Sequence, residues 1–313
     1  MNRKITLTGA NIVFLIFTAA FFIYQIMFAI LLGNKFVTEN IYFMLLINEF
    51  ILILVPVLIY AYIKKLNFRE TFRLNKPGWI PSITIILISV PVYFVAAMIN
   101  NIVVYLLQFI GKIPNQSIPI PKTIPELLIG LLVIAVVPGI CEETLHRGLL
   151  LRAYEKRGTY KALVIISIYF GLFHFDITNL LGPIFSGLII GYYVIRTNSI
   201  FAGMLAHFLN NAIAEFIQFF WSEKTQPEYT AVTSQDILQL VLYGIAGLII
   251  ASILMIFFKK VTAGKYIVTP PISSVKRDIT SVMSHWPVII ILILYFLTMI
   301  LYIVTIVVLK IMG

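Results

Sequence analysis

Residues 127–141 read LLIGLLVIAVVPGIC, a run without a single charge, and residues 142–147 continue as EETLHR. An ionised side chain at the middle of a bilayer costs on the order of 3 kcal/mol, so an uncharged run of this kind indicates a helix buried in a membrane. Two glutamates, a histidine and an arginine follow at once, where lipid would not tolerate them. This stretch therefore predicts a membrane helix whose ionisable side chains are part of a functional site.

Similar uncharged runs recur along the whole chain. They are Ala10–Asn34, Ile41–Ile63 (interrupted by Glu49), Pro77–Gly111, Leu127–Cys141, Ala162–Phe173, Ile177–Ile195, Thr197–Ala214, Ile237–Phe258 and Pro287–Leu309. Because a span of a bilayer takes roughly 20 apolar residues as a helix, these runs predict an all-α fold, a multipass transmembrane helical bundle. We expect a core of about eight helices, with the ninth added at the C-terminal end.

The composition excludes several other classes of protein. Of the 313 residues, 60% are hydrophobic and 12% are charged, whereas soluble domains hold about 45–50% and about 25%. This composition excludes a soluble enzyme and a disordered chain. A disulfide scaffold is excluded because Cys141 is the one cysteine in the sequence. The net charge of +10 is spread over short connections, so we expect the lipid bilayer, and not nucleic acid, as the partner.

The basic residues also predict an orientation. In the nine-span arrangement, 18 of the 23 Lys and Arg residues fall on the side that holds the N-terminus and 5 on the other. Since connections rich in Lys and Arg stay in the cytoplasm, we expect the N-terminus to be cytoplasmic and the C-terminus to lie outside. The short loops favour the plasma membrane of a bacterium.

Polar residues gather between residues 127 and 220, in or beside the predicted spans. They are Glu142, Glu143, His146, Arg147, His174, Asp176, His207, Asn210, Asn211 and Glu215. Residues four apart share one face of a helix, so Glu143 and Arg147 are expected to form an ion pair that holds the helix together. Glu142 is rotated by about 100° from that face and is left as a candidate base.

Three helices are expected to bring such groups to one depth. At 1.5 Å of rise per residue, Glu142, His174 and His207 lie roughly 15–21 Å, about 20 Å and about 16 Å from their nearest basic boundaries. Asn211 shares the face of His207. A carboxylate and a histidine can activate a water molecule, and a second histidine and an amide can stabilise an oxyanion.

Two other interpretations use the same residues. Glu142, His174 and His207 could instead hold Zn²⁺, since two histidines and a carboxylate with an open position make a catalytic zinc site. The cluster could also be structural and join the helices by hydrogen bonds. Pro138-Gly139 should loosen its helix and leave backbone carbonyl groups without their helical donors, which could admit water to the site. The alternative is a proline kink that serves only the packing of the helices.

Three motifs in order resemble those of the CPBP family (CAAX protease and bacteriocin-processing, or Abi) of intramembrane proteases. The chain reads Glu142-Glu143-Thr144-Leu145-His146-Arg147, Phe170-Gly171-Leu172-Phe173-His174 and His207-Phe208-Leu209-Asn210-Asn211. The resemblance implies an intramembrane endopeptidase in which Glu142 and His174 activate water while His207 and Asn211 stabilise the oxyanion. It implies no single cofactor, because both a metalloprotease and a metal-free glutamate mechanism are ascribed to the family.

The resemblance also divides the chain. We expect N-terminal transmembrane helices in residues 1–122, the catalytic core in residues 123–220, and C-terminal helices in residues 221–313 with a basic cytoplasmic linker at 259–286. The residue before the motif arginine is commonly aromatic in the family, and here it is His146. We interpret His146 as a packing substitution, the alternatives being a spare ligand or a proton relay.

The predicted function is cleavage of a peptide bond in a membrane-associated or lipidated peptide or protein. The alternative is a non-enzymatic membrane protein, such as a bacteriocin-immunity factor or a signalling scaffold, that keeps the polar cluster for its structure. A transporter is disfavoured by the odd number of spans and by the lack of a visible inverted repeat.

Overall fold

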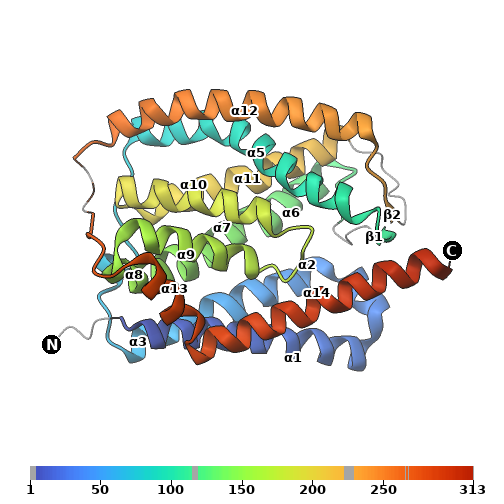
Figure 1. The fold of residues 1–313 in the computed structure, drawn as a ribbon, viewed down its shortest axis with the longest axis horizontal. Helices are drawn as coiled ribbons and strands as arrows, with labels where there is room; N and C mark the ends of the chain where they lie inside the picture. The colour runs from blue at the N-terminus through green and yellow to red at the C-terminus, as the bar shows by residue number, and fades with distance from the viewer. Residues whose placement is uncertain (1–4, 115–118, 222–228, 265, 267, 313) are drawn as a thin grey trace.

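The chain forms a bundle of long helices in the computed structural model (Figure 1). The described residues are 5–114, 119–221, 229–264, 266 and 268–312. Helices make up 81% of the structure, and seven described helices are long and apolar enough to cross a membrane. The predicted all-α, multipass transmembrane bundle is confirmed.

The elements follow one another along the chain in this order. They are α1 (Leu7–Glu39), α2 (Ile41–Ile47), η1 (Asn48–Leu54), α3 (Val55–Ile63), α4 (Phe68–Thr71), α5 (Trp79–Leu107), β1 (Ile113–Pro114), α6 (Ile124–Gly130), η2 (Leu131–Val136), α7 (Val137–Glu143), η3 (Thr144–Leu150), α8 (Leu151–Tyr154), η4 (Glu155–Arg157), α9 (Thr159–Leu172), α10 (Leu181–Thr197), α11 (Ile200–Trp221), β2 (Tyr229–Thr230), α12 (Ser234–Val261), α13 (Val275–Met283) and α14 (Trp286–Met312). Strands β1 and β2 pair antiparallel.

Two of the nine predicted spans are short. The helices α9 and α10 have 14 and 17 residues, about 21 and 26 Å of rise, whereas the hydrocarbon layer is about 30 Å thick. They pack against each other inside the bundle. The connection between them, which begins at Phe173, therefore lies close to the middle of the bundle.

The sequence placed the start of the second short helix at Ile177, and this boundary is wrong, since α10 starts at Leu181. The carboxylate of Asp176 accepts hydrogen bonds from the backbone N–H and the hydroxyl of Thr178, at 2.8 and 2.7 Å. Such a local turn competes with the helix for the same backbone groups. The start of the uncharged run, residues 177–180, thus belongs to the turn that follows His174.

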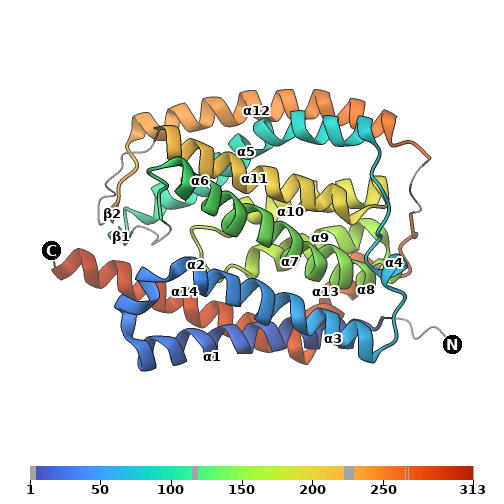
Figure 2. The same ribbon diagram turned by 180° about the vertical axis from the view of Figure 1, so that it is seen from behind.

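The helices stack in layers that both views show (Figures 1 and 2). The pair α5 and α12 forms one edge, α1 and α14 form the opposite edge, and α7, α9, α10 and α11 lie between them. The start of α1 and the end of α14 lie at opposite ends of the bundle (Figures 1 and 2).

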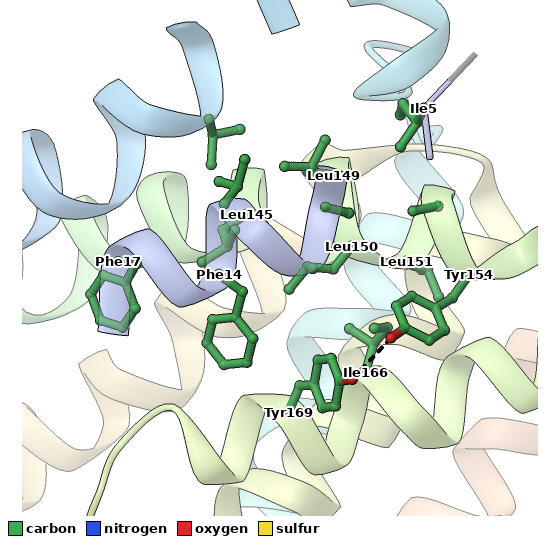
Figure 3. Close-up of a cluster of buried hydrophobic side chains, with 14 of the residues drawn as sticks. Ile5, Phe14, Phe17, Leu145, Leu149, Leu150, Leu151, Tyr154, Ile166 and Tyr169 are labelled. Carbon is green, nitrogen blue, oxygen red and sulfur yellow. Dashed lines mark hydrogen bonds between the residues drawn. The ribbon is translucent and has the colours of Figure 1, made fainter. Parts of the chain in front are cut away.

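The central helices share one hydrophobic core with the N-terminal helix (Figure 3). Phe14 and Phe17 of α1 pack beside Leu145 of η3, and the hydroxyls of Tyr154 and Tyr169 lie 2.9 Å apart. On the outer edges, large apolar side chains of α12 and α14 face outward in rows. Water would not solvate such rows, which are suited to lipid, so the chain is an integral membrane protein.

The polar connection between α12 and α14 is tied to the bundle through Asp278 of α13. This carboxylate is 2% exposed and accepts hydrogen bonds from Arg157, Lys161 and Ser273 at 2.8, 2.6 and 2.6 Å. Burial alone would raise the pKa of Asp278, but these hydrogen bonds and the nearby cations hold its pKa well below the ordinary value.

Candidate active site

The segment from α6 to η4 is one continuous apolar helix with two π-helical stretches, η2 and η3, on either side of α7. In an α-helix the N–H of residue 138 would bond the carbonyl of Ile134, but Pro138 has no N–H. The side chain of Asn211 takes that place, since its Nδ2 donates to the Ile134 oxygen at 2.9 Å. The carbonyl that the proline was expected to free therefore binds a residue of the third motif.

Glu143 is the centre of a buried ion network between α7 and α11. Its Oε1 accepts hydrogen bonds from Arg147 Nη1 at 2.7 Å and from His207 Nδ1 at 3.0 Å. Glu143 is fully buried, and Gly203 of α11 leaves room for its second oxygen, since a Cβ there would lie 2.8 Å from Oε2. The expected ion pair is present, and it also fixes the His207 ring.

Arg147 joins this network to the two short helices. Its Nη2 donates to the carbonyl of Gly187 on α10 at 3.1 Å, and its guanidinium lies 4.5 Å from the centre of the Phe170 ring on α9. A guanidinium can serve a carboxylate, a carbonyl and an aromatic face together. Arg147 therefore fixes the relative positions of four helices: its own, α9, α10 and, through Glu143, α11.

Glu142 lies on a different face of the helix from Glu143, as its position indicated, and approaches the other nitrogen of the His207 ring. Its Oε2 lies 4.0 Å from Nε2 of His207 and has no hydrogen-bond partner in the described structure. Sequence reasoning gave Glu142 no basic partner on its own helical face, and the neighbouring imidazole comes from α11 instead. One oxygen of Glu142 is therefore free to bind a water molecule.

His174 follows α9 and comes from the third side of the site. Its Nδ1 lies 2.8 Å from the carbonyl of Phe170, which can only accept, so Nδ1 carries the hydrogen. The Nε2 of a neutral imidazole then keeps its lone pair. The Phe170 ring stands edge-on to both His174 and His207, at 5.3 and 5.5 Å between ring centres, and so orients the two histidines.

These side chains line one cavity of about 550 Å³ inside the bundle. Its walls include Glu142, His174, His207 and Asn211, which the structure brings together from three segments. Glu143 and Arg147 are not part of the wall. Sequence reasoning missed Glu49 and Asn100, which also line the cavity; an acidic residue or an amide within an uncharged run is the signal that could have found them.

Residues 124–213 match the family model described as type II CAAX prenyl endopeptidase Rce1-like. This segment is Rce1-like. Neither the comparison with curated proteins nor that with solved structures finds a match. The matched segment contains all three motifs, and the resemblance to the CPBP family is confirmed. This match supports a CAAX protease, a hydrolase within the membrane.

His146 lies within the Rce1-like segment but outside the cavity. Its Nδ1 donates to the carbonyl of Glu142 at 3.0 Å, and its ring stands edge-on to Phe14, Phe170 and Phe173. It is fully buried in this aromatic cage and does not line the cavity. The arrangement agrees with a packing residue where the family commonly has an aromatic one.

The side chains of the Rce1-like segment do not fit a metal site as they stand. Among the residues that the structure describes, no three His, Cys, Asp or Glu side chains gather as ligands. Of the three zinc candidates, Glu142 and His207 lie near each other, with 4.0 Å between Oε2 and Nε2. No third ligand among the described residues joins this pair.

Proposed function

We propose that this chain is an intramembrane endopeptidase that hydrolyses a peptide bond of a membrane-associated or lipidated peptide or protein. The observation that carries the proposal is the shared cavity of Glu142, His174, His207 and Asn211. The Rce1-like match over residues 124–213 supports the same reaction class independently.

Water is activated by Glu142 and His174 in this proposal. The free oxygen of Glu142 and the Nε2 lone pair of His174 both accept hydrogen bonds, so together they orient one water molecule. Glu142 takes a proton from the water molecule while the oxygen of that water attacks the carbonyl carbon of the peptide bond. The same carboxyl then gives this proton to the nitrogen of the leaving amine, and the peptide C–N bond breaks.

The oxyanion of the tetrahedral intermediate is stabilised by His207 and Asn211. Nδ1 of His207 donates to Glu143, so donation from Nε2 requires a ring that is protonated at both nitrogens. The two carboxyl groups beside the ring, those of Glu142 and Glu143, are faced by one guanidinium, that of Arg147, so a second proton on the ring would complete the charge balance. Asn211 donates one amide hydrogen to Ile134 and keeps the second for the oxyanion.

The test uses purified full-length protein in proteoliposomes with membrane peptides as substrates, and the products are identified by mass spectrometry. Glu142→Gln removes the proton acceptor and is expected to lower the cleavage rate by about 10²- to 10⁴-fold. Glu70→Gln is the matched control, because Glu70 is exposed on α4. Undiminished cleavage by the Glu142→Gln protein would rule out Glu142 as the base.

We further propose that the N-terminus is cytoplasmic, in a bacterial plasma membrane, and that residues 123–220 form the catalytic core between the N-terminal and C-terminal helices. The excess of basic residues on one side supports the orientation. The Rce1-like match over residues 124–213 falls within the proposed core and supports its placement in this part of the chain.

A further inference from the structure

The cavity wall holds several buried oxygen atoms that have no hydrogen-bond partner. They are Oε2 of Glu49, Oε2 of Glu142, Oδ1 of Asn210, Oε2 of Glu215 and Oε1 of Gln218. All five are acceptors. An unmade hydrogen bond of a buried polar group costs about 1–3 kcal/mol, so a ligand that supplies donors would be favoured here.

The cavity is also one-sided in charge. Three carboxyl side chains line it, those of Glu49, Glu142 and Glu215, and no Lys or Arg lies among its described lining residues. The one cation that the proposed function places in this wall is His207, beside Glu142, so Glu49 and Glu215 are left without a counter-charge there. In surroundings of low dielectric constant, such a wall favours a cationic group and disfavours a carboxylate. The electrostatics therefore discriminate between peptides of opposite charge.

One stripe of α11 leads from the proposed catalytic centre to the far end of the cavity. His207, Asn210, Asn211, Ala214, Glu215 and Gln218 all line it. From His207 to Gln218 the helix rises by about 16 Å, the length of about five residues of extended chain. The stripe can thus accompany a bound peptide strand over several residues.

Glu215 is the one carboxylate on this stripe. It is 1% exposed, has no ion-pair partner among the described residues, and lies beside Gly130 of α6, where a Cβ would come within 2.3 Å of Oε2. Its Cα is eight residues beyond that of His207, about 12 Å along the helix. This length corresponds to three or four residues of an extended peptide.

We propose that Glu215 forms a substrate subsite for a Lys or Arg side chain, three or four residues from the scissile bond. Asn210 and Gln218 accept hydrogen bonds from the peptide backbone along the way. The inference rests on the proposed function and names its substrate class: peptides with a basic residue at a fixed distance from the cut. A free C-terminal carboxylate in this stretch is disfavoured.

The test measures kcat/KM of the full-length protein in proteoliposomes on one membrane peptide series. A Lys is moved through each position from five before to five after the scissile bond, with Gln at the same position as reference. At one position, three or four residues from the bond, Lys is expected to raise kcat/KM about tenfold or more. Equal rates for Lys and Gln at every position would overturn the proposal.

Two variants assign the preference to Glu215. In Glu215→Gln the ratio of Lys to Gln peptide is expected to fall to near one, whereas Glu70→Gln keeps the wild-type ratio. Gly130→Ala pushes a methyl group against Oε2 of Glu215 and is expected to lower the ratio as well, should Glu215→Gln fail to fold. A ratio that stays high in folded Glu215→Gln protein would also overturn the proposal.

Binding separates this inference from the proposed reaction. The dissociation constants of the Lys and Gln peptides are measured on wild-type and Glu142→Gln protein, without any need for cleavage. Tighter binding of the Lys peptide without cleavage by wild type supports the subsite and rejects the protease. Equal binding together with cleavage rejects the subsite and leaves the protease standing.

Discussion

The amide nitrogen of Asn211 lies 2.9 Å from the backbone oxygen of Ile134 and donates a hydrogen bond to it. Pro138 removes the α-helical donor for the same oxygen. A residue of the third motif on α11 is therefore held by a defect in the helix that carries the first motif. This contact gives Asn211 a structural role beside its proposed catalytic one.

The two roles of Asn211 can be separated. Asn211→Leu leaves the Ile134 carbonyl without its donor, and the free energy of unfolding is expected to fall by about 1–3 kcal/mol. Cleavage is expected to fall by about 10²-fold or more, because one oxyanion donor is lost. Thermal unfolding in detergent and the rate of peptide cleavage measure the two effects.

A second substitution provides the control. Pro138→Ala supplies a backbone N–H near the Ile134 oxygen, so the double variant Asn211→Leu/Pro138→Ala is expected to regain stability but not activity. Recovery of cleavage together with stability would mean that Asn211 acts through structure alone.

The ion pair of Glu143 and Arg147 is expected to be strongly coupled. Arg147→Gln leaves Glu143 as a buried carboxylate whose one remaining partner among the described residues is His207, and the free energy of unfolding should fall by about 3–5 kcal/mol. The double variant Glu143→Gln/Arg147→Gln should lose less than the sum of the single losses. Additive losses in chemical denaturation would contradict this coupling.

Helical spacing sufficed to predict the relations within one helix. The pairing of Glu143 with Arg147 and the rotation of Glu142 by about 100° from that face both follow from 3.6 residues per turn. The contact of His207 with Glu143 did not follow, because it depends on how closely α11 approaches α7, which Gly203 permits. Periodicity tells which residues share a face, but not which helix lies opposite.

The limits of the cavity were hidden from the sequence for a similar reason. Glu215 was named in the polar cluster of residues 127–220, but Glu49 belongs to a helix outside the matched segment, and only the packing of the bundle brings it to the same cavity as Glu142. The sequence left residues 174–176 as a connection but missed that it continues to Leu180, because the residues from Ile177 onward are uncharged while Asp176 and Thr178 form a turn by side-chain hydrogen bonds.

His285, just before α14, is expected to make the fold sensitive to mild acid. Nδ2 of Asn11 is an amide nitrogen, which can donate hydrogen bonds but not accept them, and it lies 2.9 Å from Nδ1 of His285. Nδ1 of His285 is therefore the acceptor, and the proton of the neutral ring is on Nε2. Burial lowers the pKa of His285. Because the pKa is lower in the folded state, the contribution of neutral His285 to the free energy of unfolding is complete above the unfolded pKa, about 6.5. It is lost as the pH falls through the folded pKa.

The thermal midpoint of the wild-type protein should accordingly decrease between about pH 7 and pH 5. His285→Gln keeps an acceptor for Asn11 but cannot take a proton, so its midpoint should change less over the same range. The same acid loss in both proteins would place the sensitive group elsewhere.

Asp278 is expected to keep α13 attached down to strongly acidic pH. Its folded pKa is depressed, so its contribution is complete above the ordinary value of about 3.9 and is lost only as the pH falls toward the folded pKa. Asp278→Asn should weaken the attachment at neutral pH by on the order of 2 kcal/mol. The rate of limited proteolysis within residues 259–286 measures the attachment of α13. Equal rates in the wild-type and Asp278→Asn proteins at pH 7 would contradict the role of this carboxylate.

The orientation of the bundle can be tested with the chain's own cysteine as an internal blank. Cys141 is fully buried and should not react with a membrane-impermeant maleimide. Lys260 and Lys310 are exposed at the ends of α12 and α14, and α14, between the 259–286 linker and the C-terminus, is long and apolar enough to cross a membrane. With 18 basic residues against 5, the linker side should be cytoplasmic. Lys310→Cys should therefore react in intact cells, and Lys260→Cys only after permeabilisation. The reverse pattern would invert the orientation, and labelling of both from one side would mean that α14 does not cross.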